Sequence, residues 1–353
     1  MTRFAPRSYL HRLQTLPCLL LFLSLLTPSL QAATLPPAPA QSMIEALSRA
    51  SAAVVGVQVD AAEGARSAQT LGPKRSGSGV VIGADGLVLT IGYLLIEAQN
   101  VSVTTADGKR FPARVVAYDL ASGFGLVRSL LPLGGIAPVP LGNLKDVSLG
   151  QAMMVATGSQ GKEDETDVAS TQLVGKRAFS GFWEYHIDLA AFTSPPIQNH
   201  SGAPLFNQRG ELVGVGSLLV MNALGDNRRV PGNMFVPVDL LRPILDELLR
   251  QGMSSKSQRP WLGLSSAENG GRVQVIRVNP GSPAEEAGIK PGDMVLAVDG
   301  NRVDSLEGFY KKLWDRPGTA VDVELTVLQG ADVRKLILKA VDRMSTMVKP
   351  AGI

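Results

Sequence analysis

The chain has 353 residues, of which 45% are hydrophobic and 18% charged, so it is long enough for about two folded domains. Its formal net charge is +3. Removing Arg3, Arg7 and Arg12 from the 34 basic residues leaves 31, which equals the 31 acidic ones. This balance argues against a nucleic acid or an anionic membrane as partner. The sequence has no Gly-rich phosphate loop and no metal-spaced Cys/His set, so we expect no cofactor and no metal.

Residues 1–33 have the pattern of a secretory signal peptide. The three arginines precede the apolar run Leu16–Leu26, and Ala32-Ala33 offers small residues for cleavage. The run is about half of the ~20 residues that a membrane-spanning helix needs. We therefore expect export to the periplasm and no transmembrane segment after cleavage, with an uncleaved anchor as the alternative. Cys18, the only cysteine, lies in this run, so the mature chain would have no thiol, as suits an oxidising compartment.

Composition and periodicity divide the rest of the chain. Residues 34–42 are rich in proline and alanine and indicate a linker. Residues 43–251 contain many short apolar runs separated by turn residues, which is typical of a β-barrel or sandwich, and Pro237–Gln251 closes this domain with a helical pattern. Residues 252–259 are polar and predict a second linker. Residues 260–343 predict a smaller domain of strands around two short helices, followed by a tail over 344–353.

A series of motifs follows along the larger domain. They are Gly77-Ser78-Gly79-Val80-Val81-Ile82, Ala84-Asp85-Gly86-Leu87-Val88-Leu89-Thr90, Asp107-Gly108-Lys109-Arg110, Leu141-Gly142-Asn143, and Ser201-Gly202-Ala203-Pro204-Leu205 with the strand from Gly210 to Gly214. In this order they resemble the HtrA/Deg family of serine proteases. The resemblance implies a mostly β protein whose larger domain is a trypsin-like double six-stranded β-barrel.

The run from Asn279 to Asp293, which reads Asn-Pro-Gly-Ser-Pro-Ala-Glu-Glu-Ala-Gly-Ile-Lys-Pro-Gly-Asp, resembles the helix and turn of bacterial PDZ domains. Within it, Ser282 is expected to cap a short helix that has Pro283 at its first position. The resemblance implies a C-terminal α+β PDZ domain over residues 260–343. PDZ domains bind peptide C-termini as an added β-strand.

The PDZ resemblance also implies where such a peptide would bind. Its carboxylate would lie on the loop Leu262-Gly263-Leu264, and Phe309 and Leu313 would face it from a helix over residues 305–315. We expect these residues to favour an apolar C-terminal side chain, and a tryptophan at Gly263 to block the loop without disturbing the core. The alternatives are that Phe309 and Leu313 belong to the core, or that the PDZ domain is only a spacer.

The catalytic triad of the family is incomplete in this sequence. A serine protease needs a nucleophile, a base and a group that orients the base. The base position, three residues after Thr90, holds Tyr93, and the position of the orienting aspartate holds Gly123, so only Ser201 is retained. Tyrosine titrates near ~10 and is a poor base at neutral pH. Loss of the base typically lowers turnover roughly a millionfold.

The other candidates around the nucleophile are also unfavourable. The chain has three histidines: His11 lies in the signal peptide, His186 in the strands of the second barrel, and His200 directly before Ser201. The oxyanion loop Asn199-His200-Ser201 begins with asparagine where the family has glycine, which tolerates positive φ more easily. We expect Tyr93 to fill the vacated pocket and to hydrogen-bond Ser201, which is then a relic.

Three functions remain for this combination. The favoured prediction is a periplasmic HtrA-like pseudoprotease in protein quality control, which binds peptide C-termini or misfolded envelope proteins through its PDZ domain. The first alternative is an active serine endopeptidase with a rearranged site around Ser201. The second is a structural or regulatory subunit, because the resemblance implies a homo-oligomer or a mixed oligomer with HtrA relatives.

Overall fold

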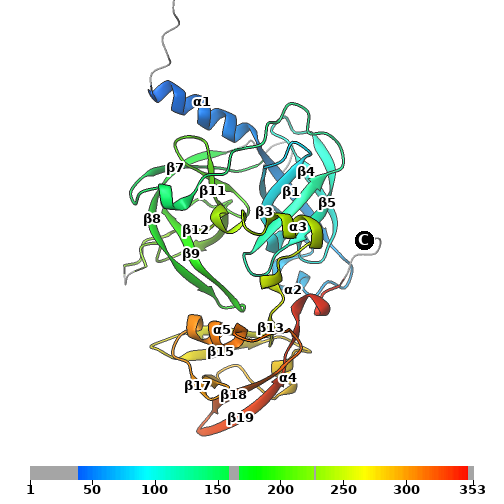
Figure 1. The fold of residues 1–353 in the computed structure, drawn as a ribbon, viewed down its shortest axis with the longest axis vertical. Coiled ribbons are helices and arrows are strands. Elements are labelled where there is room, and N and C mark those ends of the chain that lie inside the picture. The colour runs from blue at the N-terminus through cyan, green and yellow to red at the C-terminus, as the bar shows by residue number, and fades with distance from the viewer. Residues whose placement is uncertain (1–38, 159–166, 226–227, 349–353) are drawn as a thin grey trace, which may run out of the picture. The chain divides into compact units, whose positions relative to one another are not determined.

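The computed structural model describes residues 39–158, 167–225 and 228–348 (Figure 1). The predicted signal peptide lies outside these residues. No helix within the described ranges is long and apolar enough to cross a membrane. Helix α1 spans Pro39–Ala52, so the end of the segment predicted as a linker is helical. A proline is compatible with the first turn of a helix because its missing N–H would have no partner there.

Six antiparallel strands form the first barrel, which carries the shades from blue to cyan in Figure 1. They are β1 (Val54–Ala61), β2 (Lys74–Val81), β3 (Leu87–Ile91), β4 (Ala98–Thr104), β5 (Arg110–Tyr118) and β6 (Phe124–Ser129). They close in the order β1-β2-β3-β6-β5-β4. Between them lie the short helix α2 (Ala68–Leu71) and the 3₁₀ helix η1 (Gly92–Leu95). Closure leaves no free sheet edge, and the side chains that point inward form the core.

The second barrel repeats this closure, as predicted. Its strands are β7 (Ala152–Ala156), β8 (Val168–Gly181), β9 (Tyr185–Ser194), β10 (Pro204–Phe206), β11 (Leu212–Val220) and β12 (Gly232–Pro237), in the order β10-β11-β12-β9-β8-β7. The 3₁₀ helix η2 (Leu144–Asp146) precedes it. The predicted fold class, a mostly β protein with a double six-stranded barrel, is confirmed.

The helical pattern after the second barrel is correct only in part. The chain forms a 3₁₀ turn, η3 (Val238–Leu240), and then a separate helix, α3 (Leu245–Gln251), instead of one helix over Pro237–Gln251. Pro243 lies between them, and its ring and missing N–H are incompatible with a helix interior. Gly252 ends α3 in the left-handed region at φ 79°.

The C-terminal domain is an α+β PDZ domain, coloured yellow to red in Figure 1. Its elements are β13 (Pro260–Trp261), β14 (Leu264–Glu268), β15 (Val273–Val278), α4 (Pro283–Glu286), β16 (Met294–Val298), β17 (Asn301–Arg302), α5 (Leu306–Trp314), β18 (Asp322–Gln329), β19 (Asp332–Lys339) and β20 (Val341–Asp342). The main sheet has the order β14-β15-β16-β18-β19, so β14 is an edge strand. The Ser282 side chain accepts a hydrogen bond from the Glu285 N–H at the start of α4, as expected for a cap.

The segments predicted as a linker and a tail are both held against the first barrel. The linker contains the 3₁₀ helix η4 (Ser255–Ser257), and the hydroxyls of Ser254 and Ser257 donate to one carboxylate oxygen of buried Asp119, at 2.6 and 2.5 Å. The 3₁₀ helix η5 (Arg343–Thr346) leads into the tail, and the Val348 N–H donates to the Glu97 carboxylate at 2.8 Å. The Ser-rich composition therefore marks a hydrogen-bonded connection and not a flexible one.

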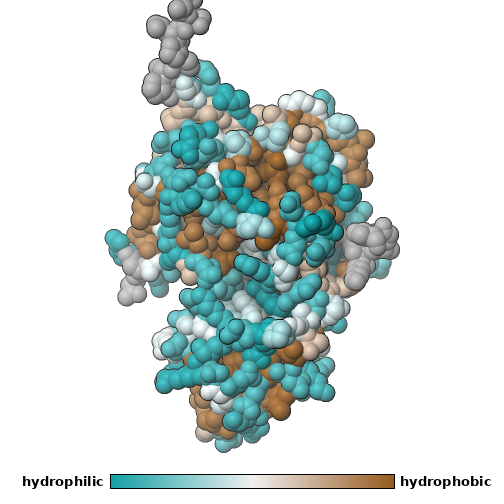
Figure 2. Space-filling model, in the orientation of Figure 1, coloured by the Kyte–Doolittle hydropathy of each residue, from teal (hydrophilic) through white to brown (hydrophobic). Residues whose placement is uncertain are grey.

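The buried apolar side chains gather in three clusters, one shared by the two barrels, one inside the second barrel and one in the PDZ domain. Figure 2 shows brown, hydrophobic areas among teal, hydrophilic ones on the viewed face. The exposed large apolar residues include Leu130 and Leu131, on the loop after β6. Apolar residues exposed in small numbers are usual for a folded protein.

We predict that Asp119→Ala lowers the free energy of unfolding by about 2–4 kcal/mol, because it leaves buried hydroxyls without their charged acceptor. Although burial raises the pKa of Asp119, hydrogen bonds from Ser122, Ser254 and Ser257 outweigh it and hold the pKa below its ordinary value. The stabilisation is therefore present above the pKa of an unfolded aspartate, about 4, and is lost as the pH falls through the lower folded-state value.

Urea denaturation at pH 7 and at acidic pH measures this effect, and trypsin cleavage after exposed Lys256 reports release of the linker. Asp60→Ala, at an exposed position of the same barrel, is the control and should change neither readout. Equal stability of the Asp119→Ala variant and the unmodified protein would contradict the prediction.

Candidate functional site

Ser201 lies on the turn between β9 and β10, and its backbone is fixed by the first barrel. The Ser78 N–H of β2 donates to the Ser201 carbonyl oxygen at 2.8 Å. The next residue, Gly202, has φ +74°, and a side chain there would overlap the Ser78 carbonyl oxygen. A glycine is therefore required after Ser201, and the hydroxyl is presented at the junction of the two barrels.

Tyr93 reaches this hydroxyl from the first barrel. It lies in η1, directly after β3, and its Oη is 2.7 Å from Ser201 Oγ and 3.1 Å from the Ser217 carbonyl oxygen. The hydrogen bond expected from the sequence is thus present. A phenol has one proton, and a carbonyl oxygen can only accept, so these atoms form a chain of neutral hydrogen bonds.

The environment of Tyr93 keeps its proton in place. Burial raises the pKa of Tyr93 to about 12, although the hydrogen bond with Ser201 acts in the opposite direction. A general base works best with a pKa near the pH of the reaction. Tyr93 at neutral pH is therefore a hydrogen-bonded phenol that cannot accept the proton of Ser201 in a catalytic step.

The two histidines of the described chain are engaged elsewhere. The Nδ1 atom of His200 is 2.8 Å from the Gln198 carbonyl oxygen, within its own turn. In His186, Nδ1 is 2.9 Å from the Ser180 hydroxyl and Nε2 is 3.2 Å from Asp188. Within the described ranges, neither imidazole forms a hydrogen bond with Ser201, so adjacency in sequence does not make His200 a base.

An aromatic ring covers Gly123, the residue expected from the sequence at the position of the orienting aspartate. Gly123 has φ +82°, and the Tyr185 hydroxyl donates to the neighbouring Ser122 carbonyl at 2.7 Å. A Cβ atom at position 123 would lie 3.1 Å from Tyr185 Oη. Sequence reasoning missed Tyr185, because an aromatic residue at the start of a strand has no pattern that indicates a contact 63 residues away.

The oxyanion turn also differs from the family pattern. Asn199 is exposed and does not have the positive φ that a glycine would permit. Ala203 is fully buried, and its N–H donates to the His200 carbonyl at 3.0 Å, which closes the turn behind Ser201. The turn thus adopts an ordinary backbone conformation at the residue where the family uses glycine.

In the PDZ domain, the predicted carboxylate loop binds a carboxylate from the same chain. The N–H groups of Leu262, Gly263 and Leu264 donate to the carboxylate of Glu184 at 3.1, 2.8 and 2.8 Å. Burial raises the pKa of the Glu184 carboxyl, while the N–H donors and Arg343 favour the ionised form and lower it. The loop has the donor geometry predicted for a peptide C-terminus, but Glu184 was not predicted as its partner.

The other predicted groove residues are inaccessible in this arrangement. Phe309 and Leu313 are fully buried and belong to the apolar cluster of the PDZ domain, which was the alternative considered from the sequence. The expectation that a tryptophan at Gly263 would spare the fold is wrong. Gly263 has φ +84°, and a side chain there would overlap Ser282 at the cap of α4.

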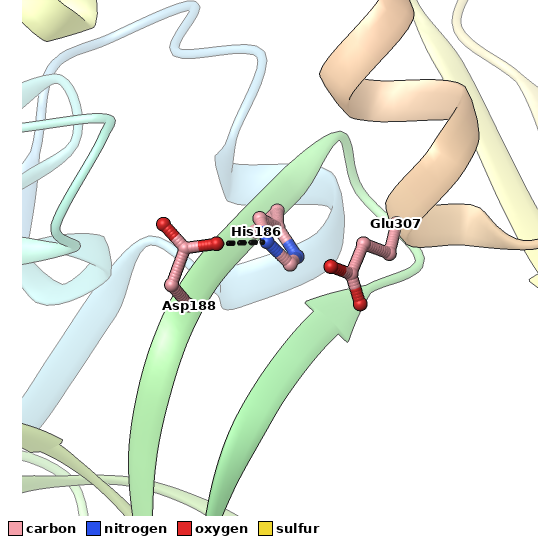
Figure 3. Close-up of side chains that lie close together, drawn as sticks. All are labelled: His186, Asp188 and Glu307. Atoms are coloured by element: carbon pink, nitrogen blue, oxygen red, sulfur yellow. Dashed lines mark hydrogen bonds and ion pairs between the residues drawn. The ribbon is translucent and has the colours of Figure 1, made fainter.

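Three further side chains meet between β9 and α5 (Figure 3). His186 and Asp188 come from β9 and Glu307 from α5, and their ligand atoms lie within 4.8 Å of one another. The ammonium group of Lys311 is 2.9 Å from Asp188 and 2.7 Å from Glu307, so it already supplies the positive charge between the carboxylates. We interpret the cluster as an ion-pair network that joins β9 to α5.

Comparisons with known proteins agree with both parts of this architecture. Residues 77–215 match the family described as a trypsin-like peptidase domain, and residues 260–339 match the PDZ domain family. A putative serine protease HhoA of Synechocystis is 25% identical over 72% of this chain and 67% of its own length. The chain is an HtrA-type homologue. A probable periplasmic serine endoprotease, DegP-like, of Halomonas elongata is 26% identical over 75% of this chain and 56% of its own length.

Solved structures share the fold of this HtrA-type homologue. The HtrA-type protease AlgW with a tripeptide superposes with a TM-score of 0.52 at 18% identity, covering 88% of this chain and 99% of that one. A serine endoprotease from Yersinia pestis gives 0.51 at 20% identity, covering 87% and 98%. The matched region spans little more than half the length of several curated relatives, such as the Halomonas protein.

We predict that rebuilding the triad fails for a steric reason. Gly123→Asp should lower the free energy of unfolding by about 2–4 kcal/mol, because it combines a positive φ with the contact to Tyr185. Gly108→Asp is the matched control: its φ is +77°, but a Cβ atom there meets nothing within 4 Å, so it should cost about 1 kcal/mol.

Chemical denaturation compares the two variants, and casein hydrolysis follows the double variant Tyr93→His with Gly123→Asp. We expect no Ser201-dependent hydrolysis from it. A double variant that is stable and cleaves casein would contradict the prediction.

Proposed function

We propose that this HtrA-type homologue is a pseudoprotease that binds peptide C-termini, or unfolded proteins that present them, through its PDZ domain. The observation that carries the proposal is the 2.7 Å contact between Tyr93 Oη and Ser201 Oγ. It puts a phenol with a pKa raised to about 12 at the place where a serine protease needs a base.

The second support is the filled space at the aspartate position. Tyr185 covers Gly123, so a carboxylate could not orient an imidazole there without displacement of the ring. The PDZ part of the proposal rests on three converging backbone N–H groups, at Leu262, Gly263 and Leu264, which bind a carboxylate. Such a set of donors is what capture of a peptide C-terminus requires.

Two alternatives are tested with the same variants. The relatives are named as serine proteases, which favours an active endopeptidase with a rearranged site around Ser201. A regulatory subunit in a mixed HtrA oligomer would need neither hydrolysis nor peptide binding by itself.

We predict that the purified protein hydrolyses casein no faster than its Ser201→Ala variant, because Tyr93 keeps its proton and neither histidine of the described residues bonds to Ser201. For the same reason, a fluorophosphonate should not label Ser201 between pH 6 and pH 10, since Tyr93 stays protonated until the pH nears 12. Tyr93→Phe keeps the ring and removes the hydroxyl, and it should be equally inactive.

The same assays would also reveal an active enzyme. A casein rate at least about tenfold above that of Ser201→Ala, or stoichiometric labelling at Ser201, would refute the pseudoprotease proposal and establish the endopeptidase.

We also propose export to the periplasm, which the Arg-rich and apolar pattern of residues 1–33 supports. The name of the Halomonas relative as a periplasmic endoprotease agrees with this location. Expression of the full-length chain in a Gram-negative host, followed by osmotic release and N-terminal sequencing, should give a protein that begins near Thr34. A released protein that starts at Met1 would contradict cleavage.

A further inference from the structure

The turn between β8 and β9 lies in the groove of the PDZ domain. We call residues 181–184 the hairpin tip: Gly181 ends β8, and Phe182, Trp183 and Glu184 form the turn. The barrels and the PDZ domain belong to one compact unit of the chain. The buried Tyr310 hydroxyl of α5 donates to the Gly181 carbonyl at 2.8 Å and accepts from the Glu184 N–H at 3.3 Å. This single hydroxyl bonds both ends of the tip.

The opposite side of the tip bonds to the edge strand of the PDZ sheet. The Ser266 N–H of β14 donates to the Phe182 carbonyl at 2.8 Å. The tip therefore lies between β14 and α5, the two elements that enclose the peptide groove of a PDZ domain. Peptides that bind to PDZ domains as an added β-strand form backbone hydrogen bonds of this kind with the edge strand.

The side-chain carboxylate of Glu184 binds where the C-terminal carboxylate of a peptide would bind. Glu184 is 3% exposed, and its carboxylate binds the N–H groups of Leu262, Gly263 and Leu264. These are the donors that a terminal carboxylate would need. A side-chain carboxylate of the chain itself thus takes the place of an external one.

The backbone conformation of the turn does not favour a glutamate at position 184. Glu184 has φ +56°, at the end of a three-residue hairpin loop, where glycine is the favoured residue. A glutamate in the left-handed region is disfavoured unless its side chain makes compensating contacts. Here the compensation comes from the three N–H donors.

A second set of contacts holds the hairpin to α5. The Lys311 ammonium bridges Asp188 of β9 and Glu307 of α5. These side chains are partly exposed, so salt screens them, and they are individually weak. The buried contacts of the tip provide the specificity, and the ion pairs add to it at the rim.

We infer that the hairpin tip is a built-in ligand of the PDZ domain, and that an external peptide binds only by displacing Glu184 from the carboxylate loop. Only a ligand with a free carboxylate can replace the three hydrogen bonds. Because the tip is tethered, it competes at a high effective concentration. The apparent affinity for a peptide is reduced by the fraction of molecules in which the groove is closed.

A cavity of about 690 Å³ adjoins the tip, and its lining combines residues 178–183 and 218–220 of the second barrel with residues 266–268 and 305–307 of the PDZ domain. It lies along β14 and the start of α5, beyond the carboxylate loop. After displacement of the tip, loop and cavity would form one groove, long enough for several residues upstream of a peptide terminus. The external ligand is therefore an extended C-terminal segment and not a single amino acid.

The test uses Glu184→Gly in the full chain, because glycine suits the turn and removes only the carboxylate. We expect amide hydrogen exchange over residues 262–264 to accelerate at least about tenfold in this variant. The matched control is Asp299→Gly, which also replaces an acidic residue at positive φ in the PDZ domain, where its carboxylate bonds to Arg316 and the Glu324 N–H and not to residues 262–264. It should leave exchange of these amides unchanged. Unchanged exchange in Glu184→Gly would overturn the inference.

The second measurement is fluorescence anisotropy with a labelled octapeptide that ends in Val-Ala-Val-Leu, as the free acid and as the amide. Glu184→Gly should bind the free acid at least about tenfold more tightly than the unmodified protein does. The amide should bind weakly to both. Measurable and equal affinity of the two proteins for the free acid would also overturn the inference.

The statement that an external peptide displaces Glu184 rests on the proposed function. The two measurements distinguish failure of this inference from failure of the proposed function. Faster amide exchange in Glu184→Gly, without peptide binding to either protein, would support the built-in ligand and refute the proposed capture of peptide C-termini.

Discussion

The buried carboxylate of Glu184 is the interaction on which the arrangement of both functional regions depends. A carboxylate loses its hydration when it is buried and requires hydrogen-bond donors in exchange. Three backbone N–H groups of the PDZ loop supply them. Because Glu184 precedes Tyr185 in the chain, the same hairpin that enters the PDZ groove also sets the ring that covers Gly123. One hairpin therefore connects the loop Leu262-Gly263-Leu264 with the surroundings of Gly123.

Two tyrosines fill the space around Ser201 and Gly123. Protein interiors are close-packed, so a side chain that occupies such a position excludes others from it. Tyr93 and Tyr185 occupy this space, and both hydroxyls have hydrogen-bond partners. Burial raises the pKa of each phenol, to about 12 in Tyr93. Each phenol thus fits its surroundings in shape and in hydrogen bonding, and each stays protonated at neutral pH.

Asp119 plays a similar organising role on the other side of Gly123. It accepts hydrogen bonds from Ser122 in its own loop and from Ser254 and Ser257 in the connection to the PDZ domain. The polar residues predicted as a linker form an ordered segment because a buried charge requires their hydroxyls. The connection between the domains is consequently part of the folded structure.

The sequence by itself determined the features that depend on neighbouring residues. Short strands with tight turns, the Ser282 cap and the PDZ helix motif are local. Collinear motifs also led to the expected contact between Tyr93 and Ser201, which the structure contains. A local rule also explains the one misjudged helix, since Pro243 alone divides it. Only the tertiary structure decided the partners of Glu184, Asp119 and Tyr185. A charged or phenolic side chain can bond to any suitable group that the fold brings near it, and Glu184 meets its donors about 80 residues further along the chain.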